Sequence, residues 1–246
     1  MRRFGLIGYP LTHSFSQKYF TEKFRQDRID DCIYQNFPLQ SFSEFPSLLR
    51  DHPDLEGFNI TIPYKEEIIP MLDSASAVVQ DIRACNCVRV RNGELHGFNT
   101  DVVGFKRSLQ NFINEPVGSA LILGTGGSAK AVAYVLNQMH IRFALVSRKP
   151  RNEEFGYQDL TEEVLKEHRL IINTTPLGMY PVDQFPAIPY WLLTPKHYLF
   201  DLIYNPAETL FLKKGKEQGA KTQNGQEMLE IQAEESWRIW NEELRS

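Results

Sequence analysis

Apolar and polar residues along the first hundred positions alternate in patterns that predict short strands and helices. Residues 4–8 form a short apolar run that ends at a turn-rich segment, and residues 15–24 repeat apolar side chains at helical spacing. Residues 33–39 and 57–62 have the composition of further strands. The segments 87–91 and 94–98 flank Asn92-Gly93, which predicts a β-hairpin.

From about residue 102 the pattern changes to continuous apolar strands separated by helices. The expected strands are residues 120–124, 143–146, 170–172 and 198–202, and the expected helices are 103–113, 128–139, 208–218 and 226–244. Fully apolar strands that alternate with helices are typical of a parallel sheet covered on both faces. We therefore expect two α/β domains with a ligand-binding cleft between them. Residues 1–101, completed by a C-terminal helix at about 225–246, form one domain, and residues 102–224 form a doubly wound second domain.

Composition and charge narrow the class of protein. Of the 246 residues, 42% are hydrophobic and 24% are charged, which is the balance of a globular chain. A net charge of −4 without a basic block argues against nucleic acid as a partner. The apolar stretch after Arg2 and Arg3 is too short for a signal peptide or a membrane span, so we expect a cytoplasmic protein.

The cysteines predict neither a disulfide framework nor a metal site. The chain has three, Cys32, Cys85 and Cys87, and the spacing of the last two does not fit a zinc knuckle or a redox pair. We expect buried thiols in a reducing compartment and no bound metal.

A glycine-rich turn after the strand at 120–124 has the order of a dinucleotide site: strand, tight turn, helix start. Gly124 permits the turn, Gly126 allows a pyrophosphate to approach the backbone, and Ala129 allows close packing of the helix on the strand. The N–H groups at the helix start then hold the phosphates. The predicted phosphate-binding residues are Gly124, Thr125, Gly126, Gly127, Ser128 and Ala129.

The end of the next strand indicates which dinucleotide binds. Asp or Glu is typical there when the ribose 2′-hydroxyl of NAD is held. This chain has Ser147, Arg148 and Lys149, and a guanidinium can bind a 2′-phosphate through two hydrogen bonds. The sequence therefore favours NADP as the cofactor, although a solvated basic turn would have the same residues.

Motifs along nearly the whole chain together resemble the shikimate dehydrogenase family. The first domain has Ser14-Phe-Ser16 after Gly-Tyr-Pro, Asn59-Ile-Thr61-Ile-Pro-Tyr-Lys65 and Asn99-Thr-Asp101-Val-Val-Gly-Phe105. The second has the glycine turn, Asn173-Thr-Thr-Pro-Leu-Gly-Met179, Asp201-Leu-Ile-Tyr204 and Asn224-Gly225-Gln-Glu-Met-Leu229. These segments occur in family order between residues 8 and 232, and in combination they are highly specific.

The resemblance implies a reaction, a fold and roles for individual residues. The family reduces the ketone of 3-dehydroshikimate to shikimate reversibly with NADPH, in chorismate and aromatic amino acid biosynthesis. A Rossmann-type NADP-binding domain would follow an N-terminal substrate domain, in a monomer or a homodimer. Lys65 and Asp101 would form the catalytic pair, and Ser14, Ser16 and Tyr204 would bind the substrate carboxylate. Thr61, Asn86, Asp101 and Gln232 would bind the ring hydroxyls, while Thr174, Leu202 and Gly225 would join Arg148 and the glycine turn around the cofactor.

The chemistry of these residues agrees with the implied roles. Hydride delivery to a carbonyl carbon leaves charge on oxygen, which needs a proton donor within hydrogen-bonding reach. A desolvated lysine beside an aspartate can supply that proton and stabilise the developing alkoxide. Taken singly, Lys65 also fits an exposed helix start, and Asp101 and the two serines fit helix caps.

Two other functions remain open from the sequence. One is a quinate/shikimate dehydrogenase that uses NAD or NADP. Such an enzyme would differ from a shikimate dehydrogenase in only a few side chains. A catalytically silent NADP-binding regulator would keep the fold, but it has no need of the pair Lys65 and Asp101.

Overall fold

The computed structural model describes residues 1–11, 15–180 and 184–242, and the chain divides into two compact units. Unit 1 contains residues 1–100 and 233–246, and unit 2 contains residues 101–232. The expected boundaries lay after residues 101 and 224. The chain instead divides after Thr100 and after Gln232, within the last helix.

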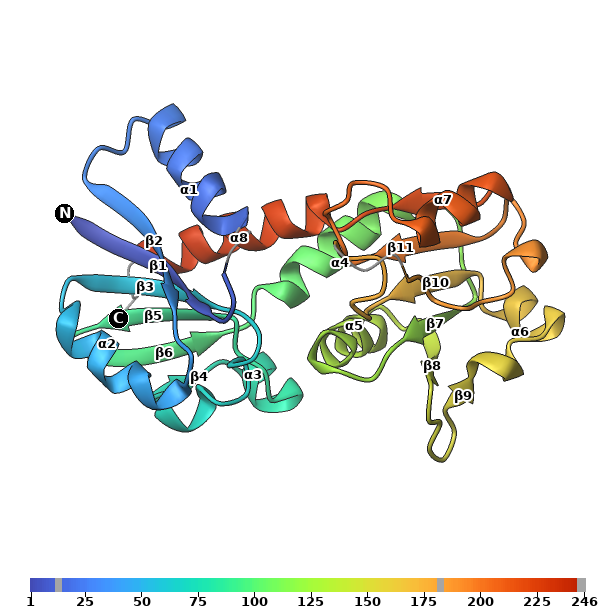
Figure 1. The fold of residues 1–246 in the computed structure, drawn as a ribbon, viewed down its shortest axis with the longest axis horizontal. Helices are drawn as coiled ribbons and strands as arrows, with labels where there is room; N and C mark the ends of the chain where they lie inside the picture. Colours follow the sequence, from blue (N-terminus) through green and yellow to red (C-terminus); the bar gives the residue numbers. More distant parts are fainter. Residues whose placement is uncertain (12–14, 181–183, 243–246) are drawn as a thin grey trace. The chain divides into compact units, whose positions relative to one another are not determined.

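Unit 1 is built on a six-stranded mixed sheet with the order β2-β1-β3-β5-β6-β4 (Figure 1). Its strands are β1 (Arg2–Gly8), β2 (Cys32–Pro38), β3 (Leu55–Ile60), β4 (Ser74–Ala75), β5 (Cys87–Arg91) and β6 (Glu94–Phe98). β1 is parallel to β2 and β3, whereas β5 is antiparallel to β3 and β6. β5 and β6 form the predicted hairpin, in which Asn92 and Gly93 both have positive φ.

Helices cover both faces of this sheet. On one face, α1 (Phe15–Gln26) and the last part of α8 (Gln226–Asn241) pack an aromatic core that includes Phe4, Phe20, Tyr34 and Trp240. On the other face, α2 (Phe45–Asp51), α3 (Ala77–Ile82) and the 3₁₀ turns η1 (Phe42–Glu44) and η2 (Ile69–Met71) cover a second core. A Cβ atom on Gly57 would lie 2.3 Å from Trp240, so β3 accepts the indole only because this position is glycine.

Unit 2 is a fully parallel sheet with the order β12-β11-β10-β7-β8-β9, which is the doubly wound order of a Rossmann fold. The strands are β7 (Ser119–Leu123), β8 (Arg142–Ser147), β9 (Phe155–Gly156), β10 (Leu170–Asn173), β11 (Tyr198–Asp201) and β12 (Lys221–Gln223). The helices are α4 (Asp101–Phe112), α5 (Gly127–Gln138), α6 (Glu162–Glu167), α7 (Leu210–Glu217) and the first part of α8, with η3 (Tyr157–Asp159) and η4 (Tyr190–Leu192).

The predicted α/β class with two sheets is confirmed, and the long predicted elements match to within a few residues. The sequence pattern did not predict the short helices α2, α3 and α6 or the two-residue strands β4 and β9. Among the described residues, no helix is long and apolar enough to cross a membrane. All three cysteines are buried free thiols.

Candidate functional site

Backbone hydrogen bonds bring three of the predicted substrate-site residues to one edge of the unit 1 sheet. Thr61 follows β3, and its N–H donates to the carbonyl of Ile7 at 2.9 Å. The carbonyl of Lys65 accepts from the N–H of Cys85 at 2.8 Å, which places Lys65 beside Asn86. Lys65 is half-buried, whereas Asn86 is only 3% exposed.

Of the two serines predicted to bind the substrate carboxylate, the structure describes one. Ser14 lies outside the described residues. Ser16 is buried in the first turn of α1. Ser16, Thr61, Lys65 and Asn86 therefore all belong to unit 1.

Asp101 and Gln232 lie on two helices of unit 2 that pack closely. Asp101 is the first residue of α4, half-buried, and an acidic group there interacts favourably with the helix dipole. One turn later, a Cβ atom on Gly104 would lie 2.6 Å from the carbonyl of Met228 and 3.1 Å from Cβ of Gln232. Glycine at position 104 therefore allows α8 to approach α4 at the turn that carries Gln232.

The glycine turn has the form that the sequence predicts. Gly124 has φ +112°, a conformation that other residues rarely adopt, and its N–H donates to Val146 at the end of β8. No side chain caps the start of α5, and a Cβ atom on Gly126 or Gly127 would meet nothing within 4 Å. The exposed N–H groups of the first turn are thus accessible to a phosphate, so the residues fit a dinucleotide pyrophosphate. Ala129 is buried and packs α5 onto the sheet.

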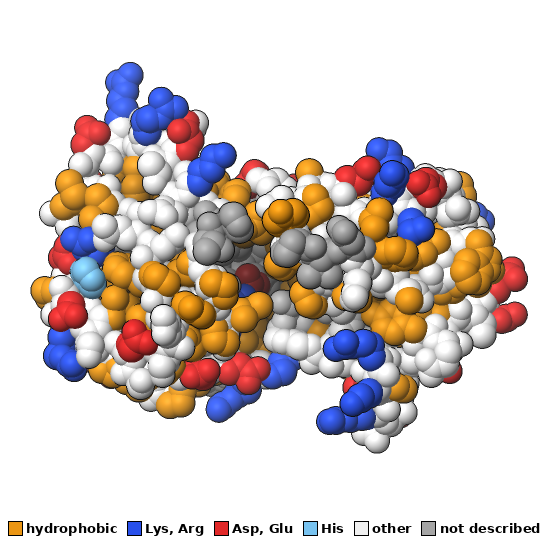
Figure 2. All heavy atoms as spheres, viewed as in Figure 1, with side chains coloured by type: hydrophobic (Ala, Val, Ile, Leu, Met, Phe, Trp, Pro, Cys, Tyr) orange, Lys and Arg blue, Asp and Glu red, His pale blue; other side chains and the backbone are white. Residues whose placement is uncertain are grey.

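The predicted 2′-phosphate residues lie beside this turn. Leu123 pairs with Val146, so the ends of β7 and β8 are neighbours. The hydroxyl of Ser147 accepts from the N–H of Lys149 at 3.2 Å, and Arg148 and Lys149 are both exposed. Figure 2 shows basic side chains gathered around the loop between β8 and β9. This arrangement suits an anion at the end of β8.

The remaining cofactor residues follow β10 and β11. Thr174 donates from both its N–H and its hydroxyl to the carbonyl of Leu123, at 3.0 and 2.7 Å, and so closes the base of the glycine turn. A Cβ atom on Gly225 would lie 2.1 Å from the carbonyl oxygen of Leu202, so only glycine allows this approach. Tyr204 is half-buried in the loop after β11.

Two buried residues that had no role in the sequence prediction organise these loops. Asn173 ends β10 and donates to the carboxylate of Asp201 at 3.0 Å and to the carbonyl of Leu177 at 3.2 Å. Asp201 also accepts from the hydroxyl of Thr209 at 2.6 Å and from the N–H of Ile203 at 3.1 Å. Burial raises the pKa of Asp201 to about 6, against the pull of these three donors. Asn173 and Asp201 each begin one of the motifs by which the sequence resembles the family. Their place in these motifs was the sequence signal that could have pointed to their role.

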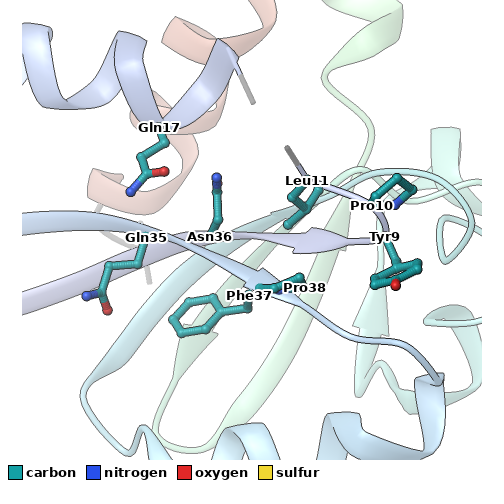
Figure 3. A pocket seen from close by; sticks show the side chains of 8 residues that line it. All are labelled: Tyr9, Pro10, Leu11, Gln17, Gln35, Asn36, Phe37 and Pro38. Atoms are coloured by element: carbon teal, nitrogen blue, oxygen red, sulfur yellow. The ribbon is translucent and has the colours of Figure 1, made fainter. Parts of the chain in front are cut away.

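A cavity of about 680 Å³ lies in unit 1, close to the start of α1 (Figure 3). It is lined by Tyr9, Pro10, Leu11, Gln17, Gln35, Asn36, Phe37 and Pro38. Of the predicted substrate-binding residues that the structure describes, none is among them, so the cavity does not by itself locate the substrate. The described residues contain no cluster of His, Cys, Asp or Glu that could hold a metal ion.

Comparison with known proteins agrees with this geometry. The family model of the shikimate dehydrogenase substrate binding domain matches residues 6–88. The shikimate dehydrogenase (NADP+) of Caldicellulosiruptor bescii is 34% identical, over 98% of this chain and 89% of that protein. A structure of shikimate 5-dehydrogenase from Thermus thermophilus in complex with NADP(H) and shikimate has a TM-score of 0.86 at 30% identity, covering 98% of this chain and 94% of its own.

One solved relative has a different substrate in its name. Quinate dehydrogenase from Corynebacterium glutamicum in complex with NAD has a TM-score of 0.86 at 27% identity, covering 98% of this chain and 93% of its own. The identity to named shikimate dehydrogenases, over nearly the full length of both chains, is nevertheless high enough to assign the family. The chain belongs to the shikimate dehydrogenase family.

Proposed function

We propose that this protein is an NADP-dependent shikimate dehydrogenase that reversibly reduces 3-dehydroshikimate to shikimate, in the cytoplasmic synthesis of chorismate and aromatic amino acids. The observation that carries the proposal is the uncapped, exposed start of α5 beside Ser147, Arg148 and Lys149 in a member of this family. An Asp or Glu that would bind the 2′-hydroxyl of NAD is replaced here by groups that suit a 2′-phosphate.

The cofactor site is assigned to unit 2. The N–H groups from Gly126 to Ala129 bind the pyrophosphate, and Gly124 and Thr174 hold the turn in shape. Arg148 binds the 2′-phosphate, with Ser147 and Lys149 beside it. The backbone at Leu202 and Gly225 faces the nicotinamide. When bound, NADPH supplies the hydride, which this set of side chains cannot provide.

The substrate site is assigned to residues that bind and orient a polyhydroxylated acid. Ser14 and Ser16 bind the carboxylate with Tyr204, and Thr61, Asn86 and Gln232 bind ring hydroxyls. Buried hydroxyl and amide groups discriminate strongly here, since an analogue lacking a hydroxyl leaves them unpaired.

Lys65 and Asp101 are assigned to proton transfer. The ammonium of Lys65 donates a proton to the carbonyl oxygen as charge develops there, and the carboxylate of Asp101 accepts a hydrogen bond from the resulting hydroxyl. In the direction of shikimate oxidation the neutral amine of Lys65 accepts the hydroxyl proton.

Initial rates with shikimate and with quinate, each with NADP and with NAD, test the proposal. We expect shikimate with NADP to be the preferred pair. Preference for quinate with NAD would refute it in favour of the alternative that the Corynebacterium relative represents.

The variant Lys65→Ala separates the enzyme from a silent NADP-binding regulator. Turnover should fall by several orders of magnitude, while the NADP dissociation constant measured by calorimetry stays within twofold. Unchanged turnover would remove Lys65 from the mechanism. Sedimentation velocity on the same samples distinguishes a monomer from a homodimer.

A further inference from the structure

The carboxylate of Asp201 accepts hydrogen bonds from three separate segments of unit 2. Asp201 is fully buried at the end of β11. The amide of Asn173, at the end of β10, donates to it at 3.0 Å, and the hydroxyl of Thr209, immediately before α7, donates at 2.6 Å. The third donor is the backbone N–H of Ile203, two residues further along the chain, at 3.1 Å. One side chain thus joins two strand ends, a helix start and the loop after β11.

The bond to Ile203 restrains the backbone at Leu202, the residue between acceptor and donor. A side-chain oxygen that accepts from the N–H two residues later closes an Asx turn. The N–H of Leu202 is held as well, because it donates to the carbonyl of Asn173 at 3.1 Å. The peptide groups on both sides of Leu202 are therefore anchored by hydrogen bonds.

The direction of the Leu202 carbonyl follows from these bonds. The peptide bond between Leu202 and Ile203 is trans, and in a planar trans peptide the C=O and N–H groups point in opposite directions. Because the N–H of Ile203 points at the carboxylate, the carbonyl of Leu202 points away from Asp201. It lies against Gly225, where a Cβ atom would be 2.1 Å from the oxygen, and the N–H of Gly225 donates to the carbonyl of Ile203 at 3.0 Å.

The carboxylate does more than fill space at the end of β11. An apolar side chain would avoid the cost of burying a charge, but it would leave three buried donors without this acceptor. For Asn173 and Thr209 the lost bond is that of a side chain, which can turn to another partner. For Ile203 it is that of the main chain, so the peptide must rotate to satisfy the N–H, and the Leu202 carbonyl rotates with it.

We propose that Asp201 is a positioning residue for the nicotinamide end of the cofactor, and that it acts through the hydrogen bond that orients the peptide between Leu202 and Ile203. The inference rests on the cofactor site of the proposed function, because it assumes that the backbone at Leu202 and Gly225 faces the nicotinamide. Asp201 needs no contact with cofactor or substrate for this role.

The test compares two ligands of the full chain by calorimetry: NADP, and adenosine 2′,5′-bisphosphate, which has the 2′-phosphate but no nicotinamide. Asp201→Ala should raise the Kd for NADP about fivefold, the usual weight of one hydrogen bond, and leave the Kd for the bisphosphate within twofold of wild type. A role in folding alone would weaken both ligands or neither, so the ratio of the two Kd values is the deciding quantity. Measurements at about pH 8 keep the wild-type side chain charged, since burial raises its pKa to about 6.

Asp201→Asn should restore the wild-type ratio of the two Kd values. The amide oxygen of asparagine can accept from the N–H of Ile203, and the hydroxyl of Thr209 can turn to accept from the amide nitrogen. Recovery with asparagine but not with alanine assigns the effect to the hydrogen bond rather than to side-chain volume. Asp201→Leu has nearly the shape of asparagine without an acceptor, and it provides the same comparison if the alanine variant does not fold.

His197→Ala is the matched control at the opposite end of the same strand. His197 lies directly before β11 and is 3% exposed. Its ring accepts from the N–H of Thr194 at 3.0 Å and lies 3.0 Å from the carbonyl of Leu165. Removal of this buried side chain also takes away polar contacts of unit 2, but we expect the ratio of the two Kd values to stay within twofold of wild type. Circular dichroism verifies that each variant is folded.

The outcomes separate this inference from the proposed function. If the wild type binds NADP but does not oxidise shikimate, the proposed function alone fails, and the Kd ratio still decides the role of Asp201. If the wild type does not bind NADP, both fail. A ratio within twofold of wild type in Asp201→Ala, or the same change of ratio in Asp201→Asn or His197→Ala, overturns the inference alone.

Discussion

The carboxyl group of Asp201 predicts a pH dependence of unit 2. It is fully buried at the end of β11, and burial raises its pKa to about 6 from an ordinary value of 3.8, although Asn173, Ile203 and Thr209 donate to it. The variant that removes the titration with little change of shape is Asp201→Asn.

The magnitude and the sign follow from linkage. A difference of about two pKa units corresponds to roughly 3 kcal/mol between the protonation states. Because the pKa is higher in the folded chain, the folded state binds more protons than the unfolded state between about pH 4 and pH 6. The contribution of this group to stability is therefore complete below pH 4 and is lost as the pH rises through 6.

Two measurements on wild type and variant test this. The ¹³Cγ resonance of Asp201 should titrate with a midpoint near pH 6. Protection of β11 amides against hydrogen exchange, corrected for intrinsic rates, should weaken from pH 4 to pH 7 in the wild type and stay nearly level in Asp201→Asn. Local exchange is preferred to a global unfolding curve because two compact units need not unfold together.

Asp159→Asn is the control for these measurements. Asp159 is an exposed carboxylate of the same unit that accepts from the N–H of Gly156 at 2.7 Å. Its removal should leave the pH dependence of β11 unchanged. A titration midpoint at or below pH 4 for Asp201 would refute the reasoning. The same pH dependence of β11 protection in the wild type and in Asp201→Asn would refute it as well.

Three further substitutions have definite expected outcomes. Arg148→Ala should raise KM for NADP at least tenfold, since a charged hydrogen bond contributes about 1.5–3 kcal/mol, and leave KM for NAD nearly unchanged; a parallel loss with both cofactors would contradict the assignment. Gly225→Ala places a methyl group 2.1 Å from the Leu202 carbonyl, so calorimetry should show NADP binding weakened by about 1–3 kcal/mol. Gly104→Ala places one 2.6 Å from the Met228 carbonyl and should displace Gln232, raising KM for shikimate more than KM for NADP in steady-state kinetics.

The parts of the fold that local sequence signals specify were predicted. The strand, glycine turn and helix from β7 to α5 needed only a continuous apolar run and the spacing of Gly124 and Gly126. The hairpin of β5 and β6 needed only alternation around Asn92-Gly93. In both cases the deciding interactions lie within about 20 residues of each other.

The interactions between distant segments could not be predicted in the same way. Asn59 and Ser236 are 177 positions apart in the chain, so no spacing could suggest that they touch. The last helix is one uninterrupted run from Gln226 to Asn241, yet its residues are divided between the two units after Gln232. Its amphipathic pattern indicates that one face of the helix is buried, but it does not indicate which sheet that face contacts. The short helices α2, α3 and α6 have six or seven residues, too few for a periodic pattern to be distinguished from a loop.

Each unit has a buried asparagine near the end of a parallel strand. Where a parallel strand ends and a ligand-binding loop begins, backbone groups lose their partners in the sheet, and a buried amide can both accept and donate in their place. Asn59 supports such a loop two positions before Thr61, by adding a second donor to the carbonyl of Asn86, which also accepts from the N–H of Ile60 at 2.9 Å. Asn173 does it immediately before Thr174, by donating to the carbonyl of Leu177 and accepting from Thr175 at 3.0 Å. The asparagines in these motifs are thus explained by the loops they hold, and a carboxylate at either position could not donate, so the loop beyond it would lose its fixed geometry.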